Sequence, residues 1–134
     1  MHKRLRNKVA LIAGADAIGL AAAKRFEAEG AEVIVRAGDA MDEKFFATLG
    51  RKHGRLDILL LNAGAMAASD LGLALRHAIP ILSPGAAVIV SDSTEGLLHD
   101  AARELAGRNV RVHGISQKKS AEDVASAAAE MAQA

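Results

Sequence analysis

Short apolar runs alternate with segments of helical periodicity along the chain, and this alternation restricts the fold more than any other feature. It is typical of βαβ units, in which helices join parallel strands and cover both faces of their sheet. The apolar runs predict strands at 8–13, 31–37, 56–61, 86–92 and 109–115. The helical segments lie at 17–29, 41–53, within 67–82, and at 94–106 and 120–134. We therefore predict a single domain over 1–134 that is a doubly wound, three-layer α/β fold of about five strands.

Two of the expected helices begin with side chains suited to capping. Asp92 is followed three residues later by Glu95, and Ser120 is followed three residues later by Asp123. Each pair combines a capping side-chain oxygen with an acidic residue in the first turn. We expect Asp92 and Ser120 to cap the helices that follow them.

Composition excludes several classes of function. Basic and acidic residues nearly balance, giving a net charge of +1, and the basic residues are scattered, which argues against a nucleic-acid or membrane partner. The absence of cysteine excludes disulfides, thiolate metal sites and thiol catalysis, and fits a cytoplasmic protein. The five histidines share no metal-ligand spacing, so we expect no metal. Nothing in the sequence predicts an oligomeric state.

An apolar run near the N-terminus imitates a signal peptide, because it follows a basic start. Asp16 and Lys24 interrupt this run, so we interpret it as a strand followed by a helix. No apolar stretch of the sequence reaches the roughly 18 residues that a membrane-spanning helix needs.

Several blocks of the chain match one family pattern. They are NKVALIAGADAIGLAAAKRFEAEGAEVIV at 7–35, GRLDILLLNAG at 54–64, AAVIVSDS at 86–93, RELAGRNVRVHGIS at 103–116 and EDVASAAAEMA at 122–132. Together they resemble the short-chain dehydrogenases/reductases, NAD(P)-dependent oxidoreductases of Rossmann fold whose members are typically much longer. By this resemblance, one βα unit is missing between the second strand and Asp39. Its removal from the family's strand order 3-2-1-4-5 leaves the flavodoxin-like order 2-1-3-4-5.

The resemblance implies that the loop after the first strand holds the pyrophosphate of a dinucleotide. The family's loop has the pattern T-G-x-x-x-G-x-G, but here Ala13 replaces the Thr, one residue is missing, and only Gly14 and Gly19 remain. These two glycines suit a tight turn and close helix–strand packing, whereas no glycine is left to let the backbone approach the pyrophosphate. The first helix still offers unpaired N–H groups to an anion. The implied pyrophosphate contacts are Gly14, Ala15, Asp16, Ala17, Ile18 and Gly19.

The choice of cofactor stays open between NAD and NADP, and any binding is expected to be weak. Arg36, at the end of the second strand, favours NADP, whereas Asp39 favours NAD or lies near the adenine. The resemblance also implies that Ala63 and Gly64 lie beside the adenosine ribose. Asn62 belongs to the same loop and is expected mainly to tie neighbouring strands together.

The resemblance fails at the catalytic residues. The family needs a tyrosine acid/base with a lysine four residues later, and this chain contains no tyrosine. Ser93 matches a catalytic position of the family, but with no base in view we favour its interpretation as a helix-start residue. We interpret the histidines as surface or helix-end residues. The alternative for His99 and His113 is a place near the ligand crevice, which in an open parallel sheet lies beyond the carboxyl ends of the strands.

Three classes of function therefore remain. The favoured one is a Rossmann-type domain with weak or vestigial NAD(P) binding and no hydride transfer. The second is an engineered or pared-down scaffold with no ligand. The third is an oxidoreductase that uses a non-standard catalytic residue such as Ser93 or His99.

Overall fold

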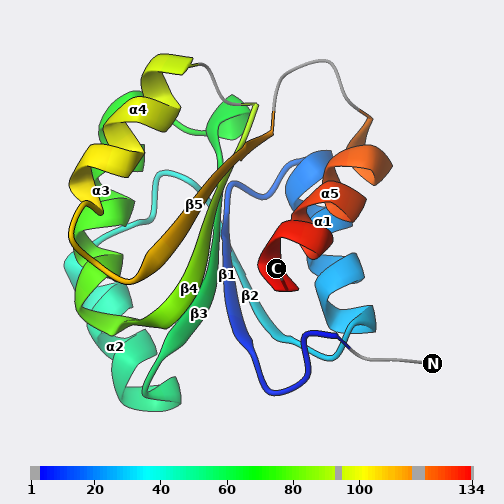
Figure 1. The fold of residues 1–134 in the computed structure, drawn as a ribbon, viewed down its shortest axis with the longest axis horizontal. Helices are drawn as coiled ribbons and strands as arrows, with labels where there is room; N and C mark the ends of the chain where they lie inside the picture. Colours follow the sequence, from blue (N-terminus) through cyan, green and yellow to red (C-terminus); the bar gives the residue numbers. More distant parts are fainter. Residues whose placement is uncertain (1–3, 93–94, 116–119, 134) are drawn as a thin grey trace.

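A computed structural model describes residues 4–92, 95–115 and 120–133. Within these ranges, five parallel strands form one sheet in the order β2-β1-β3-β4-β5 (Figure 1). The strands are β1 (Val9–Ala13), β2 (Glu32–Arg36), β3 (Leu56–Asn62), β4 (Leu82–Ser91) and β5 (Val110–Ile115). This arrangement confirms the predicted fold class and the predicted strand order.

Helices lie on both faces of the sheet, as the βα alternation predicts (Figure 1). They are α1 (Ala17–Ala28), α2 (Glu43–His53), α3 (Ala68–Ala78), α4 (Glu95–Glu104) and α5 (Ala121–Gln133). Helices α2, α3 and α4 cover one face, while α1 and α5 cover the other. No helix in the described part of the chain combines the length and the apolar character needed to cross a membrane.

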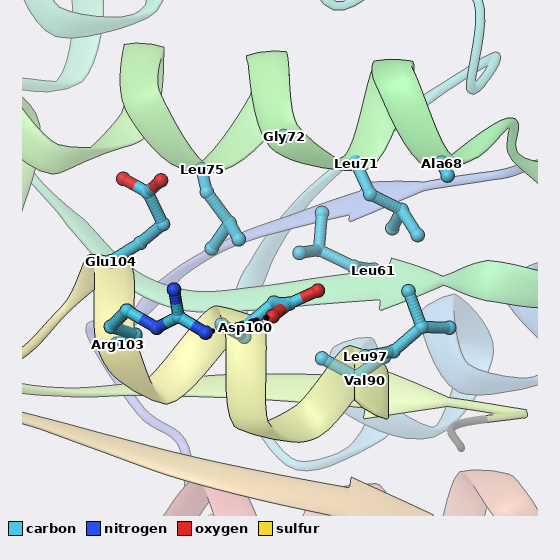
Figure 2. Close-up of a pocket in the computed structure, with 11 residues that line it drawn as sticks. Leu61, Ala68, Leu71, Gly72, Leu75, Val90, Leu97, Asp100, Arg103 and Glu104 are labelled. Carbon is cyan, nitrogen blue, oxygen red and sulfur yellow. Dashed lines mark ion pairs between the residues drawn. The ribbon is translucent and has the colours of Figure 1, made fainter. Parts of the chain in front are cut away.

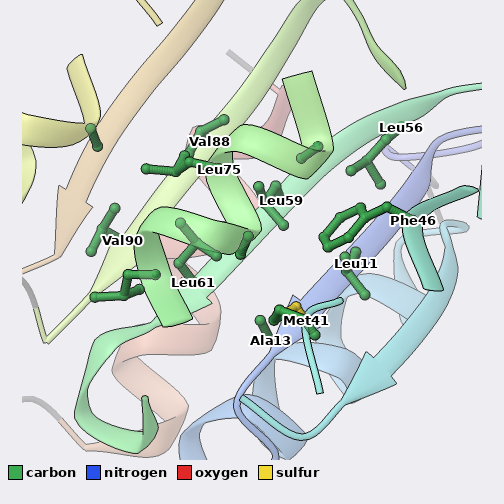
Figure 3. Close-up of a cluster of buried hydrophobic side chains, with 14 of the residues drawn as sticks. Leu11, Ala13, Met41, Phe46, Leu56, Leu59, Leu61, Leu75, Val88 and Val90 are labelled. Carbon is green, nitrogen blue, oxygen red and sulfur yellow. The ribbon is translucent and has the colours of Figure 1, made fainter. Parts of the chain in front are cut away.

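The core on the α2–α3–α4 side contains mainly larger side chains, most of them leucine and valine (Figure 3). Leu11, Leu59 and Val88 point from the sheet toward Phe46 of α2 and Leu75 of α3, and all five are buried. Every residue of β1 and β3 is buried, since helices cover the sheet on both sides. That is why these strands appear in the sequence as continuous apolar runs rather than alternating ones.

On the α1–α5 side, the two helices contribute mainly alanine to the core. Ala22 of α1 and Ala128 of α5 are fully buried there, together with the larger ring of Phe26. Small side chains let the two helices approach each other and the sheet closely. Arg25 of α1 also donates a hydrogen bond of 3.1 Å from its guanidinium to Ser126 Oγ of α5.

The start of the fourth strand differs from the sequence prediction. We predicted a start at 86, but β4 begins at Leu82, directly after a 3₁₀ turn, η2 (Ile79–Ile81). The pairing between β3 and β4 shifts register between Leu56 and Ile58, and Pro84 and Gly85 lie within this irregularity. Proline is tolerated at such a bulge because no ladder N–H is required of it.

A buried carboxylate at the amino-terminal ends of the strands joins three of them. Asp57 accepts hydrogen bonds from the Val9 N–H at 2.8 Å, from Ser83 Oγ at 2.6 Å and from Arg55 Nε at 2.9 Å. Burial opposes ionisation of this carboxyl, but the hydrogen bonds and the charge of Arg55 outweigh it, so the pKa of Asp57 lies below its ordinary value. These contacts indicate a structural role for Asp57.

One of the two capping predictions is confirmed. Ser120 Oγ accepts a hydrogen bond of 3.1 Å from the Asp123 N–H, which confirms Ser120 as the cap of α5. The prediction for Asp92 stays a prediction, because residues 93 and 94, which join it to α4, lie outside the described residues; its φ of 53° differs from the extended backbone typical of a capping residue. Two caps were missed: Asp16 begins α1, and Asp42 begins α2 by accepting a 2.8 Å hydrogen bond from the Phe45 N–H.

Candidate functional site

An open cleft of about 560 Å³ lies at the carboxyl edge of the sheet, beside the ends of β1, β2 and β3. We call it the edge cleft. The strand order reverses at β1, and in open α/β sheets ligands bind where this happens. The edge cleft is lined by Ala15, Asp16, Ala37, Gly38, Asp39, Ala65, Met66, Ala67 and Asp70.

The two glycines of the loop between β1 and α1 let the loop turn tightly and pack closely, rather than opening space for a ligand. Gly14 has a φ of 102°, and its N–H donates a 2.9 Å hydrogen bond to the Arg36 carbonyl of β2. A Cβ on Gly19 would lie 2.0 Å from the carbonyl oxygen of Gly14, so only glycine fits there. Gly14 therefore supplies the tight turn, and Gly19 lets the start of α1 pack against that turn.

Asp16 caps the first turn of α1. Its Oδ1 accepts a 3.1 Å hydrogen bond from the Gly19 N–H and a short one from Asn62 Nδ2. Asn62 Oδ1 in turn accepts a 2.9 Å hydrogen bond from Ser91 Oγ. We call this chain from β4 through β3 to α1 the Asp16 network. Asn62 and Ser91 are both fully buried, so the network holds the Asp16 carboxylate from the side of the protein interior.

The remaining residues of the glycine loop are Ala15, Ala17 and Ile18. Ala15 lines the edge cleft and is exposed. Ala17 and Ile18 form the first turn of α1, where Ala17 is exposed and Ile18 packs partly buried against the α1–α5 core.

The Arg36 side chain makes its contacts outside the edge cleft. Its Nε donates a 2.7 Å hydrogen bond to the Ala40 carbonyl, and its guanidinium lies 4.1 Å from the ring centroid of Phe45. Asp39, by contrast, is exposed and lines the cleft. Of the two residues expected to choose the cofactor, the structure therefore places only Asp39 in the edge cleft.

In the loop after β3, the residues that line the edge cleft lie slightly later in the sequence than expected. Ala63 and Gly64 begin a 3₁₀ turn, η1 (Ala63–Ala65), and Ala65 is its only residue in the cleft lining. Gly64 instead lies against Asp92, whose Oδ2 would be 2.7 Å from a Cβ added there. The next residues, Met66 and Ala67, form the wall.

Gly38, Met66 and Asp70 line the edge cleft but were not among the site residues named from the sequence. A Cβ on Gly38 would lie 2.5 Å from Met66 Cγ, so the segments that follow β2 and β3 pack against each other at this pair. The only signal for Asp70 was its place in the first turn of the third helix.

The edge cleft is acidic. Asp16, Asp39 and Asp70 contribute carboxylates to it, and no Lys, Arg or His is among its described lining residues. Such a lining disfavours anionic groups and leaves acceptors for hydroxyl or amino donors.

The structure brings no catalytic set together in the described ranges. Ser93 lies outside the described residues. His99 is exposed on α4, whereas His113 lies on β5 with its Nε2 buried and without a hydrogen-bond partner. Burial, and then the charge of Arg111, lower the pKa of His113.

Among residues 4–92, 95–115 and 120–133, no group of three or more His, Asp or Glu is placed to hold a metal ion.

A second cavity, of about 270 Å³, lies between α3 and α4 (Figure 2). Leu71 and Leu75 of α3 face Leu97 of α4 across it, over Leu61 and Val90 of the sheet. Its charged lining residues all come from α4, and they are Asp100, Arg103 and Glu104. We call it the α3–α4 cavity, and its mainly aliphatic lining offers packing rather than chemistry.

No protein-family model and no curated protein matches the chain. Solved structures do match. A short-chain dehydrogenase/reductase from Serratia marcescens superposes with a TM-score of 0.75 at 17% identity, over 96% of this chain and 91% of that one. A short-chain dehydrogenase from Burkholderia cenocepacia in complex with NADP gives 0.70 at 20% identity, over 96% and 91%. The predicted resemblance is thus confirmed for the fold, which this chain shares with the short-chain dehydrogenases/reductases.

Proposed function

We propose that this protein is a dinucleotide-binding domain that holds NAD(P) weakly in the edge cleft and does not transfer hydride. The observation that carries the proposal is the position of the cleft, at the carboxyl ends of β1, β2 and β3, where the strand order reverses. One structure of the same fold is in complex with NADP, which supports the choice of ligand class.

Weak binding follows from the lining. A pyrophosphate in the edge cleft would approach carboxylates rather than basic side chains, and the glycine that admits it in the family's loop is missing. The absence of hydride transfer follows from the sequence, because the chain has no tyrosine to serve as the family's acid/base.

Titration of NADH and NADPH, followed by nicotinamide fluorescence, tests the proposal. The chain has neither Trp nor Tyr, so the protein adds little background. We expect saturable enhancement that ADP-ribose displaces and that Gly14→Val abolishes. Gly54→Val is the matched control, since Gly54 also has positive φ, at 76°, but a Cβ there would meet nothing within 4 Å.

Two results would redirect the interpretation. No enhancement with folded protein would favour a scaffold without ligand. Substrate-dependent NADH oxidation that His99→Ala or Ser93→Ala abolishes would establish an oxidoreductase with a non-standard catalytic residue.

A further inference from the structure

The Asp16 carboxylate lies where a bound phosphate would need hydrogen-bond donors. In a dinucleotide-binding loop, free N–H groups in the first turn of the helix bind the pyrophosphate. Here the Gly19 N–H already donates to Asp16 Oδ1 at 3.1 Å. One N–H group of the first turn is thus already paired with an anion that belongs to the chain itself, and the same carboxylate occupies the positive end of the helix dipole.

The Asp16 network holds this carboxylate in place. Asn62 donates its amide hydrogen to the same Oδ1, and the amide is fixed from its other side by Ser91. Because Asn62 is fully buried, turning Asp16 away would leave its amide only the longer 3.4 Å hydrogen bond to the Gly14 carbonyl, which disfavours that movement. An incoming phosphate therefore meets a fixed negative charge instead of a side chain that can move aside.

The rest of the edge cleft suits a ligand without charge. Ala37, Gly38, Met66 and Ala67 form a mainly apolar lining that a planar base can contact. Asp39 is exposed beside them and can accept hydrogen bonds from ribose hydroxyls or from an exocyclic amino group.

We propose that the edge cleft selects the uncharged adenosine part of a nucleotide over its phosphates, and that the Asp16 carboxylate is the residue that sets this preference. The proposal rests on the proposed function, because it concerns the same cleft. It makes the cleft a nucleoside site in which each added phosphate weakens binding. A single carboxylate within about 6 Å of a phosphate lowers affinity roughly tenfold or more near a protein surface.

The test compares Asp16→Asn with the wild type. The substitution removes the charge, while the amide oxygen of the new side chain can still accept from Gly19 and Asn62. Asp42→Asn is the matched control: Asp42 caps α2 in the same way, lies outside the edge cleft, and gives the same change in net charge. Asp16→Ser is a second variant that caps a helix without charge.

Adenosine, ADP and NADH are titrated into ¹⁵N-labelled protein, and amide shifts report both affinity and location. We expect the wild type and Asp42→Asn to bind adenosine more tightly than ADP. In Asp16→Asn and Asp16→Ser, affinity for ADP should rise about tenfold or more, while affinity for adenosine stays within about twofold. The shifts should centre on the amides of Gly14, Gly19 and Gly38.

The outcomes separate the two proposals. If NADH and ADP bind but the ratio of ADP to adenosine affinity is the same in the wild type and both Asp16 variants, Asp16 does not set the preference and the inference fails alone. If none of the three ligands shifts any amide in any folded variant, the proposed function fails and the inference fails with it.

Discussion

Replacing Gly19 with alanine should destabilise the protein, whereas the same change at Gly72 should stabilise it. Both glycines lie inside helices, where alanine is favoured by about 1 kcal/mol. A Cβ at Gly72 would find only the Arg76 guanidinium, at 3.9 Å and 4.0 Å, which is ordinary contact. We therefore expect Gly72→Ala to raise the free energy of unfolding by about 0.5–1 kcal/mol.

At Gly19 the steric cost exceeds the helical gain. The added Cβ would lie 2.0 Å from the Gly14 carbonyl oxygen, a backbone atom that cannot rotate away. Moving the loop costs about 1–3 kcal/mol for the misfit and roughly a further 1 kcal/mol or more for the disturbed Asp16–Gly19 hydrogen bond. After the helical gain of about 1 kcal/mol is subtracted, we expect Gly19→Ala to lower the free energy of unfolding by about 1–3 kcal/mol. Urea unfolding followed by circular dichroism at 222 nm measures both variants. Equal or greater stability of Gly19→Ala relative to the wild type would refute this account of the loop.

Three further predictions follow from contacts elsewhere. The pKa of Asp57 in the folded protein is below the ordinary value of 3.8. The contribution of Asp57 to the free energy of unfolding should therefore be present above about pH 4 and be lost as the pH falls through the folded pKa. Acid-unfolding titrations should show this loss in the wild type and not in Asp57→Asn. Asn62→Ala should lower the free energy of unfolding by about 2–3 kcal/mol, because it leaves the buried Ser91 hydroxyl unpaired, and a loss below about 0.5 kcal/mol in urea titrations would contradict this. Arg36→Met should leave the ratio of NADH to NADPH affinity unchanged in fluorescence titrations, since the guanidinium is held by Ala40 and Phe45, and a selective loss of NADPH binding would overturn that reasoning.

The layered fold could be predicted because its determinants are local. Each apolar run that became a strand is short and is followed by a helical segment, so the pattern alone indicates parallel strands with covering helices. The strand order came from the resemblance to a longer family with one βα unit removed, and the sheet has that order. The start of β4 was missed because Pro84 and Gly85 resemble strand breakers, and only the register shift against β3 makes room for them.

The candidate site was predictable in position but not in chemistry. The cleft lies over the glycine loop and the end of β2, as expected from topology. By the resemblance, Asp16 was expected to contact a pyrophosphate. The position of Asp16 just before a helix is, however, a standard signal for a capping residue. That Asp16 meets Asn62, 46 positions away, and through it Ser91, depends on strand order and register, which no local pattern specifies.

The two helical layers differ in how much change they can absorb. Between α1 and α5, fully buried alanines such as Ala22 and Ala128 leave no room for a larger side chain. Between α3 and α4, an unfilled volume of about 270 Å³ already separates aliphatic side chains over the sheet. Substitutions that enlarge an aliphatic side chain should therefore be tolerated between α3 and α4 and should destabilise the protein between α1 and α5. A new binding function could thus be introduced between α3 and α4 while the alanine-packed layer keeps the fold intact.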